Sequence, residues 1–199
     1  MTVRIILASQ SQIRRQLLAN AGIACDVMPA RVDEEAVKDA LLAEGATPRD
    51  TADALAELKA AKISERERGA LVIGCDQVLA FDGKILSKPA SPEEARAQLR
   101  ALRGKTHRLV SAAVICEDGR PTWRHVGVVQ MQMRDVSDAY LDDYIARNWE
   151  SIRHSVGAYK LEEEGVRLLS RVSGDYFHVL GLPLLELIGF LAAREEIET

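Results

Sequence analysis

The chain has 199 residues, of which 47% are hydrophobic and 28% are charged, and its formal net charge is -4. This length fits a single domain with a substantial core, and we expect one domain over residues 1–199. A weakly acidic chain lacks the basic surface that binds nucleic acid polymers. No apolar run approaches the roughly 20 residues of a membrane span. We therefore expect neither a nucleic acid polymer nor a membrane as a partner.

The first residues and the cysteines indicate the compartment. Residues 1–4 lead directly into a β-branched run and show no signal-peptide pattern. Cys25, Cys75 and Cys116 are odd in number, widely spaced and without a Cys-x-x-Cys pair, which argues against a disulfide framework and a structural zinc site. We expect a cytoplasmic protein.

Residues 7–18 join a predicted strand to a predicted helix through a short polar turn, in which Ser9 and Ser11 are both candidate N-caps. Arg14 and Arg15 fall in the first helical turn, where the helix dipole disfavours a cation. An anion bound to the free backbone N–H groups would turn this penalty into attraction, so the pattern suggests a phosphate site. The alternative is an ordinary solvated arginine pair.

An acidic stretch follows the second predicted strand, which covers residues 25–28. Residues 32–35 place three carboxylates at the end of this strand, where they could hold a divalent cation. The alternative is an acidic first turn of a helix over residues 35–44. The next predicted helix starts at Thr47 and runs to about Arg66, and Lys59 lies on its polar side, where lysines are often only solvated.

Residues 69–80 form the strongest predicted strand, and Asp76 interrupts its apolar run. A buried carboxylate needs a partner, because an unpaired buried charge costs several kcal/mol or is neutralised by a shifted pKa. A metal or a lysine would serve, and Asp76 could then act as a general base for an attacking water. The alternative is that Asp76 ends the strand at a turn.

The rest of the chain supplies further elements and one more cation. An Asp-Gly turn at 82–83 predicts a hairpin, whose return strand at 85–87 leads to Lys88, a point charge suited to phosphate. We further expect a helix from Ser91 to Gly104, an antiparallel meander of strands at 108–116 and 123–133, a helix from Ser137 to Asn148 and a final helix at 183–193. The glycines at 157, 165, 174 and 181 predict tight turns that line a cavity instead of a regular element.

Six short motifs follow one another along the chain. They are Leu-Ala-Ser-x-Ser-x-x-Arg-Arg at 7–15, Val-Asp-Glu at 32–34, Leu-Ala-x-x-Lys-Ala at 55–60, Gly-x-Asp-Gln-Val at 74–78, Lys-Pro at 88–89 and Gly-Leu-Pro-Leu at 181–184. In this order and spacing they resemble the Maf family of nucleoside triphosphate pyrophosphatases. The resemblance implies an α/β fold with a central mixed β-sheet flanked by helices, more distantly similar to inosine-triphosphate pyrophosphatases, and an active cleft between two lobes.

The resemblance also implies a reaction and a set of site residues. Such enzymes cleave a nucleoside triphosphate between its α- and β-phosphates, giving the monophosphate and pyrophosphate, with a divalent metal such as Mg²⁺, Mn²⁺ or Co²⁺. The implied catalytic residues are Asp76, which activates the water, Glu34, Lys59 and Lys88. The implied substrate-binding residues are Ser9, Ser11, Arg14, Gln77, Lys160 and Glu162. Glu34 and Asp76 are the implied metal ligands.

Two branches of the family differ at residues that concern the base. The branch that hydrolyses dTTP and UTP typically has Thr where this chain has Gln77, and Gln where it has Glu162. Gln77, the apolar Ile13 and the pair Lys160-x-Glu162 are more similar to the branch that acts on 7-methyl-GTP. A carboxylate could accept from guanine N–H groups and oppose the charge of the methylated base. The alternative is that Glu162 belongs to a solvated acidic run.

The sequence therefore favours an enzyme that hydrolyses a modified or non-canonical nucleoside triphosphate, such as 7-methyl-GTP, in a house-cleaning role. A dTTP/UTP pyrophosphatase is the nearest alternative. A nucleotide-binding regulator of cell division without turnover is an alternative of another class. The sequence is compatible with a homodimer as well as with a monomer.

Overall fold

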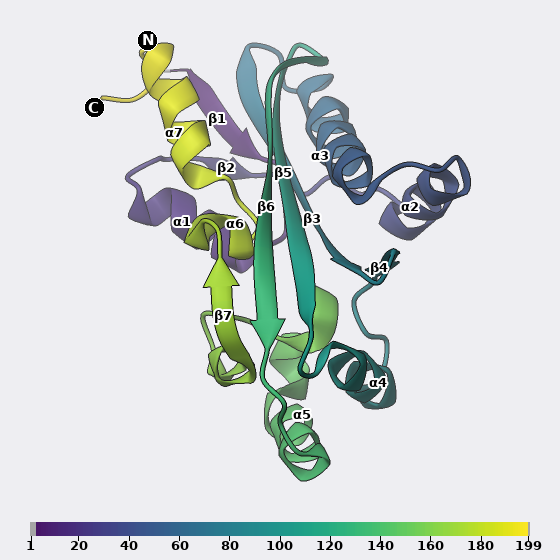
Figure 1. Ribbon diagram of the computed structural model, residues 1–199. Helices are drawn as coiled ribbons and strands as arrows, with labels where there is room; N and C mark the ends of the chain where they lie inside the picture. The colour runs from purple at the N-terminus through teal and green to yellow at the C-terminus, as the bar shows by residue number, and fades with distance from the viewer. Residues whose placement is uncertain (1–2, 199) are drawn as a thin grey trace. The chain divides into compact units, whose positions relative to one another are not determined.

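The seven strands described in the computed structural model, which covers residues 3–198, form one mixed β-sheet (Figure 1). The strands are β1 (Arg4–Leu7), β2 (Asp26–Val27), β3 (Ala70–Phe81), β4 (Lys84–Leu86), β5 (Thr106–Glu117), β6 (Arg120–Met133) and β7 (Leu169–Ser173). Their order is β2-β1-β3-β5-β6-β7, and β4 pairs with β3. β1 is parallel to β2 and β3, whereas β3–β4 and β6–β7 are antiparallel. The predicted α/β fold with a central mixed sheet is confirmed.

Side-chain caps set most of the helix starts. The α-helices are α1 (Gln12–Asn20), α2 (Glu34–Ala43), α3 (Pro48–Ser64), α4 (Pro92–Leu102), α5 (Asp138–Ile152), α6 (Tyr176–Val179) and α7 (Leu184–Ala193), and two 3₁₀ turns cover Val156–Ala158 and Glu164–Leu168. Thr47, Ser91 and Ser137 each accept a hydrogen bond from the backbone N–H three residues later. The helix starts predicted at these three residues are therefore confirmed.

The chain divides into two compact units that alternate along the sequence. The first unit contains residues 3–77, 111–127 and 181–198, and the second contains 78–110 and 128–180. The chain passes from one unit to the other within β3, β5 and β6 and again before Gly181.

In the first unit, α3 packs directly on β3. Gly74 of β3 leaves no space for a side chain, because a Cβ there would collide with the Ala56 carbonyl oxygen and lie 2.9 Å from the Ala60 Cβ. Helix α2 lies beside α3 (Figure 1). Trp123 of β6 stacks on Phe190 of α7 with ring centroids 5.4 Å apart, which joins the last helix to the sheet. The close approach at Gly74 brings the buried face of α3, which includes Lys59, next to the residues that follow Gly74 in β3. The prediction that Lys59 lies on the polar side of this helix was therefore wrong, because its side chain is buried against the sheet.

The second unit has its own apolar core. It is built by inward-facing residues of the strands, by one face each of α4 and α5, and by the segment 158–169; the largest fully buried members are Leu79, Leu99, Leu102, Met131, Met133 and Tyr144. Helices α4 and α5 pack against each other (Figure 1). Asp138 at the start of α5 accepts hydrogen bonds from Arg100 at 2.6 Å and from Arg103 at 2.7 Å. These two ion pairs supplement the apolar contact between α4 and α5.

Two predictions about local structure were wrong. Helix α5 does not end at Asn148 but continues to Ile152. The Asn148 amide donates to the Tyr144 carbonyl oxygen at 2.9 Å and to Glu164 at 2.8 Å, so it stays within the helix. The glycine-rich last quarter also contains regular elements, the edge strand β7 and the short helix α6. β7 is held by its pairing with β6. The sequence of a five-residue segment gives only a weak signal for a strand whose stability depends on a partner elsewhere in the chain.

Among the described residues, no helix is long and apolar enough to cross a membrane.

Candidate active site

A buried ion pair lies where α3 meets β3 in the first unit. Asp76 of β3 is 6% exposed, and its Oδ1 lies 2.7 Å from the Nζ of Lys59, which is also buried. Strand β3 continues past Asp76 to Phe81, so this residue does not end the strand. Lys59 therefore supplies the partner that a buried carboxylate needs.

Glu34 completes a three-residue cluster. It begins α2, where Asp33 is the N-cap, and its Oε2 lies 3.0 Å from the same Lys59 Nζ. Glu34 therefore belongs both to the acidic first turn of α2 and to the cluster around Lys59. Two carboxylates share one ammonium group, and the Glu34 side chain remains 42% exposed while that of Asp76 is 8% exposed.

The pKa of Asp76 is raised above its ordinary value. Burial is the main cause, because it disfavours the charged carboxylate. The positive charges of Lys59 and Arg14 oppose this shift, and the negative charge of Glu34 adds to it. A carboxylate with a raised pKa is a stronger base than an exposed carboxylate of ordinary pKa, and it therefore accepts a proton from water more readily.

Arg14, in the first turn of α1, contacts the backbone of β3 next to Asp76. Its Nη1 donates to the carbonyl oxygen of Cys75 at 3.0 Å and to the Oγ of Ser9 at 3.3 Å, and its Nε donates to the carbonyl oxygen of Gly181 at 2.7 Å. Ser11 is the N-cap of α1 and accepts from the backbone N–H of Arg14. These oxygen atoms of the protein accept hydrogen bonds from the Arg14 guanidinium and so offset the unfavourable effect of the helix dipole on its positive charge. Arg15 is exposed.

Gln77 follows Asp76 and is tied to the neighbouring strand. Its side-chain Nε2 donates to the Oγ of Ser111 in β5 at 2.9 Å, and Ser111 is fully buried. Sequence reasoning missed Ser111, because a single serine within a long apolar strand carries no motif.

The first unit thus holds seven of the predicted site residues, and the other three belong to the second unit. The seven are Ser9, Ser11, Arg14, Glu34, Lys59, Asp76 and Gln77. In the second unit, Lys88 is exposed after β4, and Lys160 Nζ lies 2.6 Å from the Ser151 Oγ and 3.1 Å from Glu163. Glu162 is exposed, whereas Glu164 pairs with Arg147 at 2.7 Å. The roles of all ten residues toward a substrate remain predictions.

The second unit also carries an open depression of about 230 Å³. Its lining is polar and comes from β5, β6 and β7: Thr106, Gln130, Gln132, Arg171 and Ser173. The predicted cavity lined by glycine-rich turns does not match this depression, because no glycine is among its lining residues. Strands with outward-facing polar side chains form it instead.

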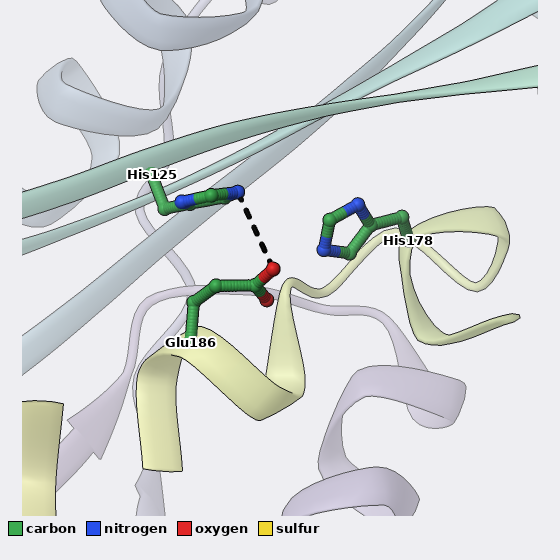
Figure 2. Close-up of side chains that lie close together, drawn as sticks. All are labelled: His125, His178 and Glu186. Carbon is green, nitrogen blue, oxygen red and sulfur yellow. Dashed lines mark ion pairs between the residues drawn. The ribbon is translucent and has the colours of Figure 1, made fainter. Parts of the chain in front are cut away.

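A further contact, between a histidine and a carboxylate, lies in the first unit. Figure 2 shows His125 of β6 and Glu186 of α7, whose Nε2 and Oε1 atoms lie 3.5 Å apart. The His125 ring also stacks on Trp123 with centroids 6.4 Å apart. The pair therefore joins α7 to β6, as the stacking of Trp123 on Phe190 does.

The donor chemistry of Glu34 and Asp76 fits a divalent cation. Mg²⁺ is bound through one or two carboxylates and takes its remaining oxygen ligands from water and phosphate. Both carboxylates lie close to the Lys59 Nζ, and this single ammonium group offsets only one of their two negative charges. Softer metals prefer imidazole or thiolate ligands. Within the described part of the chain, no histidine or cysteine side chain is among those that converge on Lys59.

Comparison with known proteins decides the family. A family profile described as Maf-like protein matches residues 4–194, almost the whole chain. The chain belongs to the Maf family. A nucleoside triphosphate pyrophosphatase from Roseobacter denitrificans is 65% identical to this Maf protein over 97% of both chains. One of the same name from Ruegeria pomeroyi is 63% identical over the full length of both. A 7-methyl-GTP pyrophosphatase from Brucella abortus is 46% identical, also over the full length of both.

Proposed function

We propose that this chain is a nucleoside triphosphate pyrophosphatase, and that its substrate is a modified guanosine triphosphate such as 7-methyl-GTP. The observation that carries the activity is the cluster of Asp76, Lys59 and Glu34 in a chain of the Maf family. It joins a buried carboxylate of raised pKa to a cation and to a second carboxylate.

In the proposed reaction, the anhydride between the α- and β-phosphates is broken by water. Asp76 accepts a proton from the water, whose oxygen bonds to phosphorus, and pyrophosphate leaves. Lys59 and Arg14 stabilise the negative charge that develops on the phosphate oxygens. Lys88 is proposed as a further phosphate ligand. Positioning and charge neutralisation are the main contributions that a protein makes to phosphoryl transfer.

We also propose that the enzyme uses a divalent cation. Glu34 and Asp76 would hold it, and when bound it would neutralise charge on the phosphate oxygens. Lys59 already holds the two carboxylates close together, so their mutual repulsion is offset before any cation binds.

The proposed specificity rests on Gln77, Lys160 and Glu162. The Gln77 amide is held by Ser111, so it presents a fixed orientation. Glu162 is exposed and can accept hydrogen bonds from a guanine edge while its charge opposes that of the methylated ring. The name of the Brucella abortus relative supports this substrate, whereas the relatives from Roseobacter and Ruegeria carry the broader name.

Pyrophosphate release from dTTP, UTP, GTP and 7-methyl-GTP tests the proposal. Each nucleotide is assayed with Mg²⁺, with Mn²⁺, with Co²⁺ and with a chelator. We expect the highest kcat/KM on 7-methyl-GTP and loss of turnover with the chelator. A preference for dTTP or UTP would reject the proposed substrate but keep the activity. Release from none of the four would favour a nucleotide-binding regulator.

A further inference from the structure

The segment Gly181-Leu182-Pro183-Leu184 is the motif to which no role has been assigned. Leu182 and Leu184 are buried in the first unit, and Pro183 is the N-cap of α7, so the segment is fixed by packing. Gly181 at its start has a φ of +85°, in the left-handed region that favours glycine. This backbone conformation presents the Gly181 carbonyl oxygen to the Nε of Arg14 at 2.7 Å.

The guanidinium of Arg14 is held on two of its three nitrogens. Nε donates to Gly181, and Nη1 donates to the Cys75 carbonyl oxygen and to Ser9. Because a guanidinium is planar, these bonds fix the direction of the remaining nitrogen. Among the residues that the structure describes, Nη2 has no hydrogen-bond acceptor, so its two N–H groups are available to an anion.

Gly181 also leaves space beside this nitrogen. A Cβ at position 181 would lie 2.9 Å from Nη2 and 3.1 Å from Nε of Arg14. Both distances are shorter than ordinary contacts of a methyl group, so a larger residue would push the guanidinium away from the Gly181 carbonyl and cover one side of Nη2.

We propose that Gly181 is a positioning residue for Arg14, which it orients through its carbonyl oxygen while keeping Nη2 open to a phosphate of the substrate. The phosphate role of Arg14 rests on the proposed function. The dependence of Arg14 on Gly181 rests on the contacts alone, and the two can be tested separately.

The test compares Gly181→Ala with Gly45→Ala. Gly45 lies in the exposed turn after α2 and has a φ of +82°, and a Cβ at this position would meet no atom within 4 Å. Both variants place alanine in a left-handed conformation, and each should lower the melting temperature by about 2–4 °C. Only Gly181→Ala disturbs Arg14. The affinity for inorganic tripolyphosphate is measured by titration calorimetry on the full chain, beside the kcat and KM of pyrophosphate release.

We expect Gly181→Ala to weaken tripolyphosphate binding and raise KM by roughly tenfold, and Gly45→Ala to change both by less than about twofold. In an Arg14→Ala background, Gly181→Ala should have no further effect on tripolyphosphate affinity. Equal affinities of the two glycine variants, an undiminished effect without Arg14, or no binding of tripolyphosphate by the unsubstituted protein would each overturn the proposal. Tripolyphosphate binding without pyrophosphate release from any nucleotide would reject the proposed function alone.

Discussion

The Nζ of Lys59 lies 2.7 Å from the Oδ1 of Asp76, and both side chains are almost fully buried. A pair of this kind contributes little net stability, because desolvation offsets the attraction between the charges. Removal of one partner is costly, since it leaves the other charge buried and unpaired. Lys59→Met should therefore lower the free energy of unfolding by about 3–5 kcal/mol.

Urea denaturation of Lys59→Met measures this loss. The double variant Lys59→Met with Asp76→Leu serves as the control, because it removes both charges and should regain most of the stability. A single variant within about 1 kcal/mol of the original protein would contradict the account of the pair.

Asp76→Asn should remove the proposed general base while keeping the shape of the side chain. We expect kcat for pyrophosphate release to fall by roughly 10²–10⁴-fold, with nucleotide affinity changed only a few fold. The exposed Asp39 on α2 offers a matched control, and Asp39→Asn should leave both quantities unchanged. Asp76 is not the base if its variant turns over substrate near the original rate.

Glu162→Gln keeps the size of the side chain and removes its charge. If Glu162 recognises the methylated base, kcat/KM on 7-methyl-GTP should fall by roughly tenfold, because a hydrogen bond to a charged group contributes about 1.5–3 kcal/mol. Activity on UTP should change by less than about twofold. Steady-state kinetics on both nucleotides give the comparison, and equal losses would show that Glu162 does not select the base.

His107 gives a prediction for the pH dependence of stability. Its Nε2 lies 2.7 Å from the Tyr159 Oη, and its buried Nδ1 has no hydrogen-bond partner within the described residues. Burial lowers the pKa of His107 from 6.5 to about 4. Between these values the unfolded chain binds a proton that the folded chain does not, so stability present above pH 6.5 is lost as the pH falls toward 4. The total loss is on the order of 3 kcal/mol.

Urea denaturation at pH 7, 5.5 and 4.5 measures this dependence in the original protein and in His107→Gln. Glutamine can keep a hydrogen bond to Tyr159 but does not titrate, so the variant should lose less stability between pH 7 and 4.5. The same loss in both proteins would show that other groups control the acid response.

Much of the fold could be predicted, because several of its signals are local. Ser91 with Pro92 marks a helix start through capping and backbone geometry alone. The Asp-Gly turn at 82–83 predicts the hairpin of β3 and β4, since both residues adopt the positive φ that a two-residue hairpin requires. β7 was missed because a short edge strand depends on a partner far away in the sequence.

The strand-turn-helix segment that carries Arg14 also combines features set by the local sequence with features set only by the tertiary structure. The sequence by itself determined that a strand, a capped turn and a helix place Arg14 where the helix dipole disfavours it, because these are properties of neighbouring residues. Only the tertiary structure decided what holds Arg14. Its acceptors at Cys75 and Gly181 are 61 and 167 residues away and become neighbours only when the chain folds. The pairing of Lys59 with Asp76 was likewise decided by the packing of α3 on β3, which the missing side chain of Gly74 permits.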